Sequence, residues 1–369
     1  MYSQNELDDA VAAGAISAES AAALRNFIEI QRSQPAVDEE QFRLITGFND
    51  IFVSIAAVIL LVAVGWIGQW AGASLGTQVE FDGPSFVAPA AVAATSWALA
   101  LFFTGKRRMA LPSILLLLAF VGSVFATAAF ALVLAVGPET VGDNNQLQGI
   151  LAAASGLVAA GAAWLHWKQF RVPITVAAGA AAVSAIAIGL LLAALGQNVE
   201  QAKNVILGFV LLLGLGVFTV AMRWDGSDPA RVTRRSDVAF WLHLLAAPMI
   251  AHPVFALLGL NEGSVSIGEG LVVVLLYILF GLTALAIDRR ALLVSALAYV
   301  LFALNELFKQ FGAIELNVAL TALIIGSSLL LLSAFWHQAR EAVVRPLPES
   351  LRAKLPVLDR SALASPPAA

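Results

Sequence analysis

The chain has 369 residues, of which 60% are hydrophobic and 12% are charged, and its mean hydropathy is +0.85. A soluble domain usually carries about 25% charged residues, so the composition excludes an ordinary soluble protein and indicates an integral membrane protein. The chain contains no cysteine, which excludes disulfide bonds, thiolate catalysis and metal sites built from cysteine.

Residues 1–47 are predicted to form a cytoplasmic helical hairpin. Ser3 and Glu6 have the spacing of a capping box, in which each side chain satisfies a free backbone N–H group at the start of a helix. Gly14 suits the left-handed position after that helix, and Ser17 is the predicted cap of a second helix. The segment holds no short apolar core followed by a cleavage site, so we expect no cleaved signal peptide.

Residues 48–337 are predicted to form an all-α bundle of ten transmembrane helices. Each predicted span is close to the roughly 20 residues that cross a bilayer as a helix. The predicted spans are 50–70, 86–104, 111–136, 148–166, 173–195, 204–222, 238–259, 270–287, 291–311 and 317–336.

Positive charges predict the orientation of this bundle. Of the 21 Lys and Arg residues, 19 fall on one side of the predicted spans, and Lys203 and Lys309 are the exceptions. Basic residues mark cytoplasmic loops, so both termini are expected in the cytoplasm of a protein of the inner (cytoplasmic) membrane. Insertion topology accounts for these charges, and nucleic acid is not an expected partner. Residues 338–369 are predicted to be a cytoplasmic, disordered tail rich in Pro and Ala.

Small residues recur at four-residue spacing on three predicted spans. They are Ala90, Ala94 and Ala98; Ala152, Gly156 and Ala160; and Ala177, Ala181, Ala185, Gly189 and Ala193. Such stripes let helix backbones approach closely in a membrane. Packing within the chain is the main interpretation, and a homodimer face is the alternative.

The predicted span 238–259 is the most unusual. Pro248 and Pro253 each remove a backbone N–H and clash with the carbonyl four residues earlier, so both are candidate helix breaks that bend the span or line a cavity. His252 lies at membrane depth and is a candidate proton carrier or ligand donor. The alternative is a neutral histidine that is hydrogen-bonded to a neighbouring span. His243, nearer the inner interface, is interpreted as structural.

Two aspartates near the inner interface are given structural interpretations. Asp237, with Ser236, is expected to cap the start of the span 238–259. Asp288, which precedes Arg289 and Arg290, is interpreted as an ordinary loop charge.

The predicted span 291–311 carries Asn305, Glu306 and Lys309. Glu306 and Lys309 are three residues apart and share one face of a helix, so one interpretation is an ion pair at the outer end with Lys309 extended to water. The other interpretation places Glu306 toward the bundle at a depth similar to that of His252. The two would then titrate together or bind a substrate cation.

Two segments carry a family resemblance. Residues 6–20, Glu-Leu-Asp-Asp-Ala-Val-Ala-Ala-Gly-Ala-Ile-Ser-Ala-Glu-Ser, resemble the N-terminal helical-hairpin domain of a bacterial family of multi-pass membrane proteins of unknown function. Residues 236–255, which include Phe-Trp-Leu-His and Ile-Ala-His-Pro, look similar to such proteins too. The resemblance implies a bacterial inner-membrane protein and supplies no substrate or catalytic residues.

Several functions remain open from the sequence. The leading hypothesis is a small-molecule transporter with its site near His252 and Glu306. Proton-coupled transport and transport without protons both remain open. The second is a non-catalytic accessory or assembly protein that recruits a cytoplasmic partner through residues 1–40. The chain has no Walker A loop, His-Glu-x-x-His, Gly-x-Ser-x-Gly or pair of mid-span aspartates. We therefore expect no cofactor and no metal, and we expect that the protein is not an enzyme. A membrane enzyme that acts on lipid-linked substrates is kept as the third hypothesis.

Overall fold

The computed structural model describes part of the chain, which divides into two units. The described residues are 11, 13–21, 23, 48–80, 83–229, 231, 233–259, 267–310, 317–352 and 355–358. One unit comprises Met1–Arg43 with Asp359–Ala369, and the other is Leu44–Leu358.

The described residues of the first unit agree with the predicted local signals. Gly14 has a left-handed φ of +71°. The backbone N–H of Ser20 donates to Ser17 Oγ at 3.1 Å, which is the predicted cap. The remainder of the predicted hairpin lies outside the described residues, as do residues 353, 354 and 359–369 of the predicted tail. The described part of that tail is helical over 338–344 and 349–352, where disorder is predicted.

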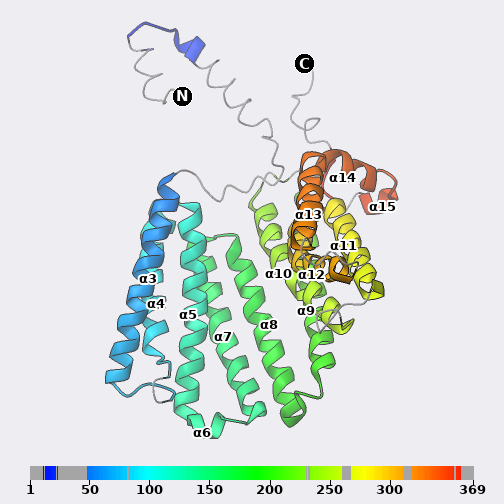
Figure 1. Ribbon diagram of the computed structural model, residues 1–369. Coiled ribbons are helices and arrows are strands. Elements are labelled where there is room, and N and C mark those ends of the chain that lie inside the picture. The colour runs from blue at the N-terminus through cyan, green and yellow to red at the C-terminus, as the bar shows by residue number, and fades with distance from the viewer. Residues whose placement is uncertain are drawn as a thin grey trace. The chain divides into compact units, whose positions relative to one another are not determined.

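The second unit is built from helices (Figure 1). They are α3 (Phe48–Ser74), α4 (Val87–Ala100), the π-helix η1 (Leu101–Lys106), α5 (Ala110–Val136), α6 (Pro138–Val141), α7 (Asn145–Phe170), α8 (Ile174–Leu195), the 3-10 helix η2 (Gly196–Asn198), α9 (Lys203–Gly226), α10 (Arg234–Leu257), α11 (Ile267–Ile287), α12 (Ala291–Gln310), α13 (Asn317–Ala334), α14 (Trp336–Val344) and α15 (Glu349–Arg352). Over the described ranges, the β pairing is limited to an isolated antiparallel bridge between Gln78 and Ser85.

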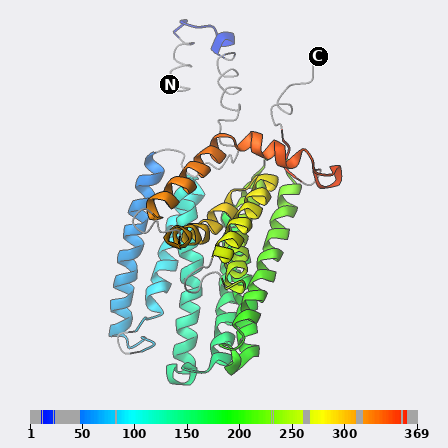
Figure 2. The ribbon, with the colours of Figure 1, turned by 45° about the vertical axis from the view of Figure 1, so that its right-hand side comes forward.

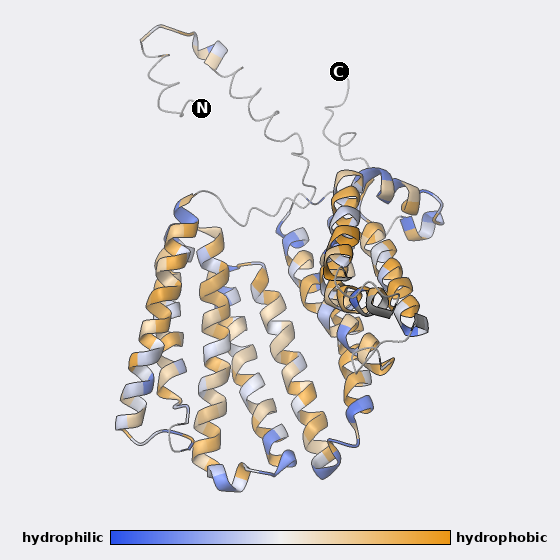
Figure 3. Cartoon of the chain, viewed as in Figure 1, coloured by the Kyte–Doolittle hydropathy of each residue, from blue (hydrophilic) through white to orange (hydrophobic). Residues whose placement is uncertain are grey.

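Most of these helices are apolar along their length. Among the described residues, eight are long and apolar enough to cross a membrane: α3, α4 with η1, α5, α7, α8, α9, α10 and α11. Apolar residues cover their middles and polar residues gather at their ends (Figure 3). The predicted class, an all-α multi-pass membrane protein, is confirmed.

The C-terminal helices leave the span count open. α13 and α14 qualify together as a ninth span, but they meet at a bend of 77° (Figure 2). The apolar part of α12, Ala291–Asn305, is shorter than the other spans. Each of the ten predicted spans falls largely on a helix, and ten crossings remain a prediction.

Helices α3 to α8 pack in chain order. α3, α4 and α5 contact one another, α5 contacts α7, and α7 lies along α8 (Figure 1). The α7–α8 contact is closest where Gly149 faces Gly189 and Ala193. A Cβ on Gly189 would lie 2.7 Å from the backbone N of Ala153. Members of the predicted small-residue stripes are therefore used for packing within the chain.

Helix α10 lies between helices that come before it and after it in the chain. It packs against α8, α9 and α12. In its most apolar stretch 56% of the residues are buried, against 17–44% in the other candidate spans. Because a membrane helix buried by other helices is shielded from lipid, α10 is where polar groups are most easily placed.

Helix α10 is continuous through Pro248 and Pro253, so neither proline ends the helix, and a bend or a cavity lining there stays a prediction. Pro253 removes the hydrogen-bond partner of the Met249 carbonyl, and α9 covers that carbonyl. A Cβ on Gly214 of α9 would lie 2.9 Å from the Met249 carbonyl oxygen. Helix α9 thus packs directly against the backbone of α10 at the carbonyl whose internal hydrogen bond is lost.

Gly214→Ala is expected to destabilise the protein, because the added methyl group overlaps the Met249 backbone and overpacking typically costs about 1–3 kcal/mol. Thermal unfolding of the purified protein in detergent measures the effect. Gly216→Ala is the matched control on the same helix, since its new Cβ has no neighbouring heavy atom within 4 Å. Equal melting temperatures of the two variants would contradict the close approach of α9 and α10.

Candidate functional site

Ion pairs are buried where α9 ends, α10 begins and α11 turns into α12. Asp225, in the last turn of α9, accepts two hydrogen bonds from Arg289, from Nη2 to Oδ1 at 2.6 Å and from Nε to Oδ2 at 3.3 Å. His243 Nε2 lies 3.0 Å from Asp225 Oδ2. Arg289 also donates to Ser236, to its carbonyl oxygen at 3.0 Å and its hydroxyl at 3.2 Å. Asp225, His243 and Arg289 are each 2% exposed.

A second carboxylate holds the other half of this cluster. Asp288 Oδ2 accepts from Arg231 Nη1 at 2.8 Å, and Asp288 Oδ1 accepts from the Trp336 indole N–H at 2.8 Å. Arg340 of α14 places its Nε 3.7 Å from Asp288 Oδ1. Arg340 also donates to the carbonyls of Pro356 at 2.6 Å and Val357 at 3.1 Å. The cluster therefore ties α14 and residues 355–358 to the α11–α12 turn.

The backbone of the two connecting segments brings these side chains inward. Arg231 and Asp288 have left-handed φ values of +54° and +56°. Arg231 Nη2 donates to the carbonyls of Ile287 and Asp288, both at 3.1 Å. The segment before α10 is thereby fastened to the turn after α11.

The charges of this buried ion cluster balance. We use this name for Asp225, Asp228, Arg231, His243, Asp288, Arg289 and Arg340. These residues supply three carboxylates and three guanidinium groups, so their formal charges cancel when His243 is neutral. His243 Nδ1 is buried and has no hydrogen-bond partner in the described part of the chain. A neutral ring with its proton on Nε2, donated to Asp225, fits this environment.

Two sequence-based interpretations of this region are wrong. Asp288 is 2% exposed and paired, so it is not an ordinary loop charge. The cap of α10 is Thr233, which accepts from the N–H of Arg235 at 3.2 Å. Asp228 in turn accepts from the backbone N and hydroxyl of Thr233. The structure thus starts α10 one turn earlier than the expected cap and leaves Ser236 to bind Arg289.

His252 is the predicted pathway candidate for which the structure shows a side-chain partner. Its Nδ1 lies 2.6 Å from the hydroxyl oxygen of Tyr299 on α12. The Tyr299 ring stacks on Phe255 at a centroid distance of 4.3 Å and an interplanar angle of 11°. Because His252 is exposed and Tyr299 is half-buried, the pair lies at the surface of the α10–α12 contact. A bond to a neighbouring helix was the structural alternative for His252, and proton carriage stays a prediction.

The other pathway candidates lie farther along α12. Asn305 is half-buried, and Glu306 and Lys309 lie in the last turns of the helix. The side chains of Glu306 and Lys309 are outside the described part. Since seven residues make two helical turns, Glu306 occupies the same face of α12 as Tyr299 in register. Tyr299 is the member of this face that the sequence analysis missed.

Comparisons with known proteins add no identity. The chain matches no protein-family model, no curated protein and no solved structure. The resemblance of residues 6–20 and 236–255 to a bacterial membrane-protein family therefore stays a prediction. Within the described residues, no group of three or more His, Asp and Glu side chains is arranged to hold a metal ion. The site is thus defined by its own geometry, which comprises a polar pair between α10 and α12 and, nearer the start of α10, a buried ion cluster.

Asp288→Asn is expected to lower stability by about 3–5 kcal/mol, because it leaves buried guanidinium groups without their countercharge. Asparagine keeps the shape and tolerates a left-handed φ, so the change isolates the charge. Asp143→Asn, at an exposed carboxylate, is the control, and thermal unfolding in detergent is the measurement. An Asp288→Asn variant as stable as the control would show that the cluster contributes nothing to stability.

Proposed function

We propose that this chain is a ten-span protein of a bacterial inner membrane, with both termini in the cytoplasm, that moves a small solute across the bilayer coupled to protons. The observation that carries the proposal is the hydrogen bond between His252 and Tyr299, which joins two apolar helices. Polar groups at membrane depth are costly and are usually retained for function. Histidine is also the side chain whose ordinary titration lies nearest neutral pH.

The His252–Tyr299 pair supplies groups that a proton pathway needs. The imidazole accepts a proton at one nitrogen and releases one from the other, and a phenol hydroxyl both donates and accepts. Glu306 follows Tyr299 on α12 by seven residues, which is about two helical turns. A solute bound beside the pair would change the surroundings of His252 and so its affinity for a proton. That change couples the binding of the solute to the binding of the proton.

The buried ion cluster supplies a fixed support for this pathway. It fastens the ends of α9 and α10 to the α11–α12 turn at Asp225 and Asp288. Transport requires one group of helices to move relative to another. We infer that α10 and α12 pivot about this fastened end, so that the far ends of the helices open and close beside His252.

The test begins with a ligand search on the purified protein. Thermal stability is measured across a library of small metabolites at several pH values, for the unmodified protein, His252→Gln and Tyr299→Phe. The control is His337→Gln, at an exposed histidine of α14. A ligand of the folded state raises stability by mass action. We expect a compound whose shift depends on pH, persists in His337→Gln and is lost in His252→Gln.

Such a compound is then tested for movement. Proteoliposomes that enclose a pH-sensitive dye receive the compound on one side, and internal acidity is followed. The proposal predicts a compound-dependent pH change that His252→Gln abolishes. No stabilising compound, or proton movement that is equal in His252→Gln, would reject the transporter and favour an accessory protein that recruits a partner through residues 1–40.

A further inference from the structure

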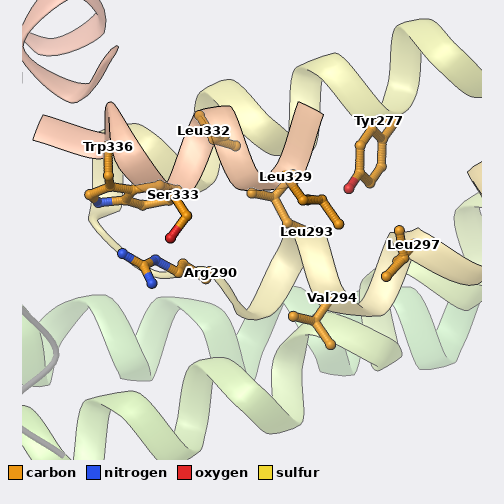
Figure 4. A pocket seen from close by; sticks show the side chains of 9 residues that line it. All are labelled: Tyr277, Arg290, Leu293, Val294, Leu297, Leu329, Leu332, Ser333 and Trp336. Atoms are coloured by element: carbon orange, nitrogen blue, oxygen red, sulfur yellow. The ribbon is translucent and has the colours of Figure 1, made fainter. Parts of the chain in front are cut away.

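A half-open groove lies between α11, α12, α13 and the start of α14. It encloses about 110 Å³, and its walls include Tyr277, Leu293, Leu297, Leu329 and Leu332. In Figure 4 these apolar side chains converge from α11, α12 and α13, and Arg290 lies with Trp336 at one end of the groove. The wall residue Val294 is 64% exposed, so the groove opens to the surface of the unit.

The apolar walls define what fills this groove. A cavity needs about 10–15 Å³ to hold one water molecule, so size does not exclude water. Water also needs two to four polar partners, and apolar cavities stay dry and take up hydrocarbon instead. In a membrane, the hydrocarbon at hand is the acyl chain of a lipid. The groove therefore suits a few methylene groups of such a chain.

The Arg290 end of the groove has the chemistry of the headgroup layer. The Arg290 guanidinium carbon lies 4.7 Å from the centroid of the Trp336 ring, and the planar guanidinium with its five N–H donors matches the geometry of a phosphate. Tryptophan is typical of the interface between membrane and water. By the predicted orientation, this end faces the cytoplasmic leaflet, which carries anionic lipids, and basic pockets between helices on that side bind such headgroups.

We propose that the groove is a binding site for an anionic phospholipid of the cytoplasmic leaflet. The lipid phosphate pairs with Arg290, and one acyl chain lies along Leu293, Leu297 and Leu329 toward Tyr277. The Tyr277 hydroxyl is buried with no hydrogen-bond partner in the described residues. Tyr277 lies at the opposite end of the groove from Arg290 (Figure 4). This inference rests on the membrane orientation proposed above and does not depend on transport.

The test uses purified full-length protein in detergent, supplemented with phosphatidylglycerol, phosphatidylcholine or inorganic phosphate, and thermal stability is measured. We expect phosphatidylglycerol to raise the melting temperature more than phosphatidylcholine does, and inorganic phosphate to have no effect. Arg290→Gln should lose the excess shift with phosphatidylglycerol. Arg345→Gln is the matched control, since Arg345 directly follows α14 and its side chain is 77% exposed.

A second variant tests the acyl-chain site. Leu297→Trp places an indole in the groove and should abolish the response to both lipids, whereas Leu330→Trp, at a residue of α13 that is 73% exposed, should preserve it. Equal shifts with the two lipids, or an excess that survives in Arg290→Gln, would overturn the proposal. A response to inorganic phosphate alone would identify an anion site in place of a lipid site. If Leu297→Trp fails to fold, the Arg290→Gln comparison decides.

Discussion

The pairing of two buried carboxylates with arginines from distant segments is the constraint on which the arrangement of the helices depends. Asp225 binds Arg289, 64 residues away, and Asp288 binds Arg231, 57 residues away. In a bilayer, helix association gains little from the hydrophobic effect, because lipid tails are as apolar as leucine. Polar links that are costly to break therefore count for more in positioning α9, α10, α11, α12 and α14.

Close backbone packing complements these polar links. Gly189 against Ala153 joins α8 to α7, and Gly214 against Met249 joins α9 to α10. Because α10 contacts α8, α9 and α12, it is held by small-residue packing and by the ion cluster at once. His252 lies on this same helix, so its partner Tyr299 is presented by α12 in a defined position. Helix α10 therefore carries residues of the buried ion cluster and also His252 of the proposed pathway.

The helices and several local signals follow directly from the sequence. Apolar length predicts each long helix, and four-residue spacing of small residues predicts the packing of Gly156 and Gly189. Proline rules describe an isolated helix, so they do not predict that α10 continues through Pro248 and Pro253 with α9 packed against its backbone at Met249.

The ion cluster and Tyr299 are not predictable in the same way. The positive-inside rule already explains every arginine near Asp288, so no basic residue remains unexplained to point to a buried pair. Pairings across 47 to 64 residues depend on which helices become neighbours. The spacing of residues within one helix does not show which other helices become its neighbours. His252 was found because a histidine at membrane depth is unusual by itself, whereas a tyrosine in an apolar helix is not.

The most direct test of this account is the coupling between Asp225 and Arg289, measured by a double-mutant cycle. The free energies of unfolding of Asp225→Asn, Arg289→Gln and the double variant are compared with that of the unmodified protein. The account predicts that each single change is strongly destabilising and that the double change costs less than their sum by at least about 1 kcal/mol. Additive effects, within about 0.5 kcal/mol, would contradict the claim that this buried pair holds the helix ends together.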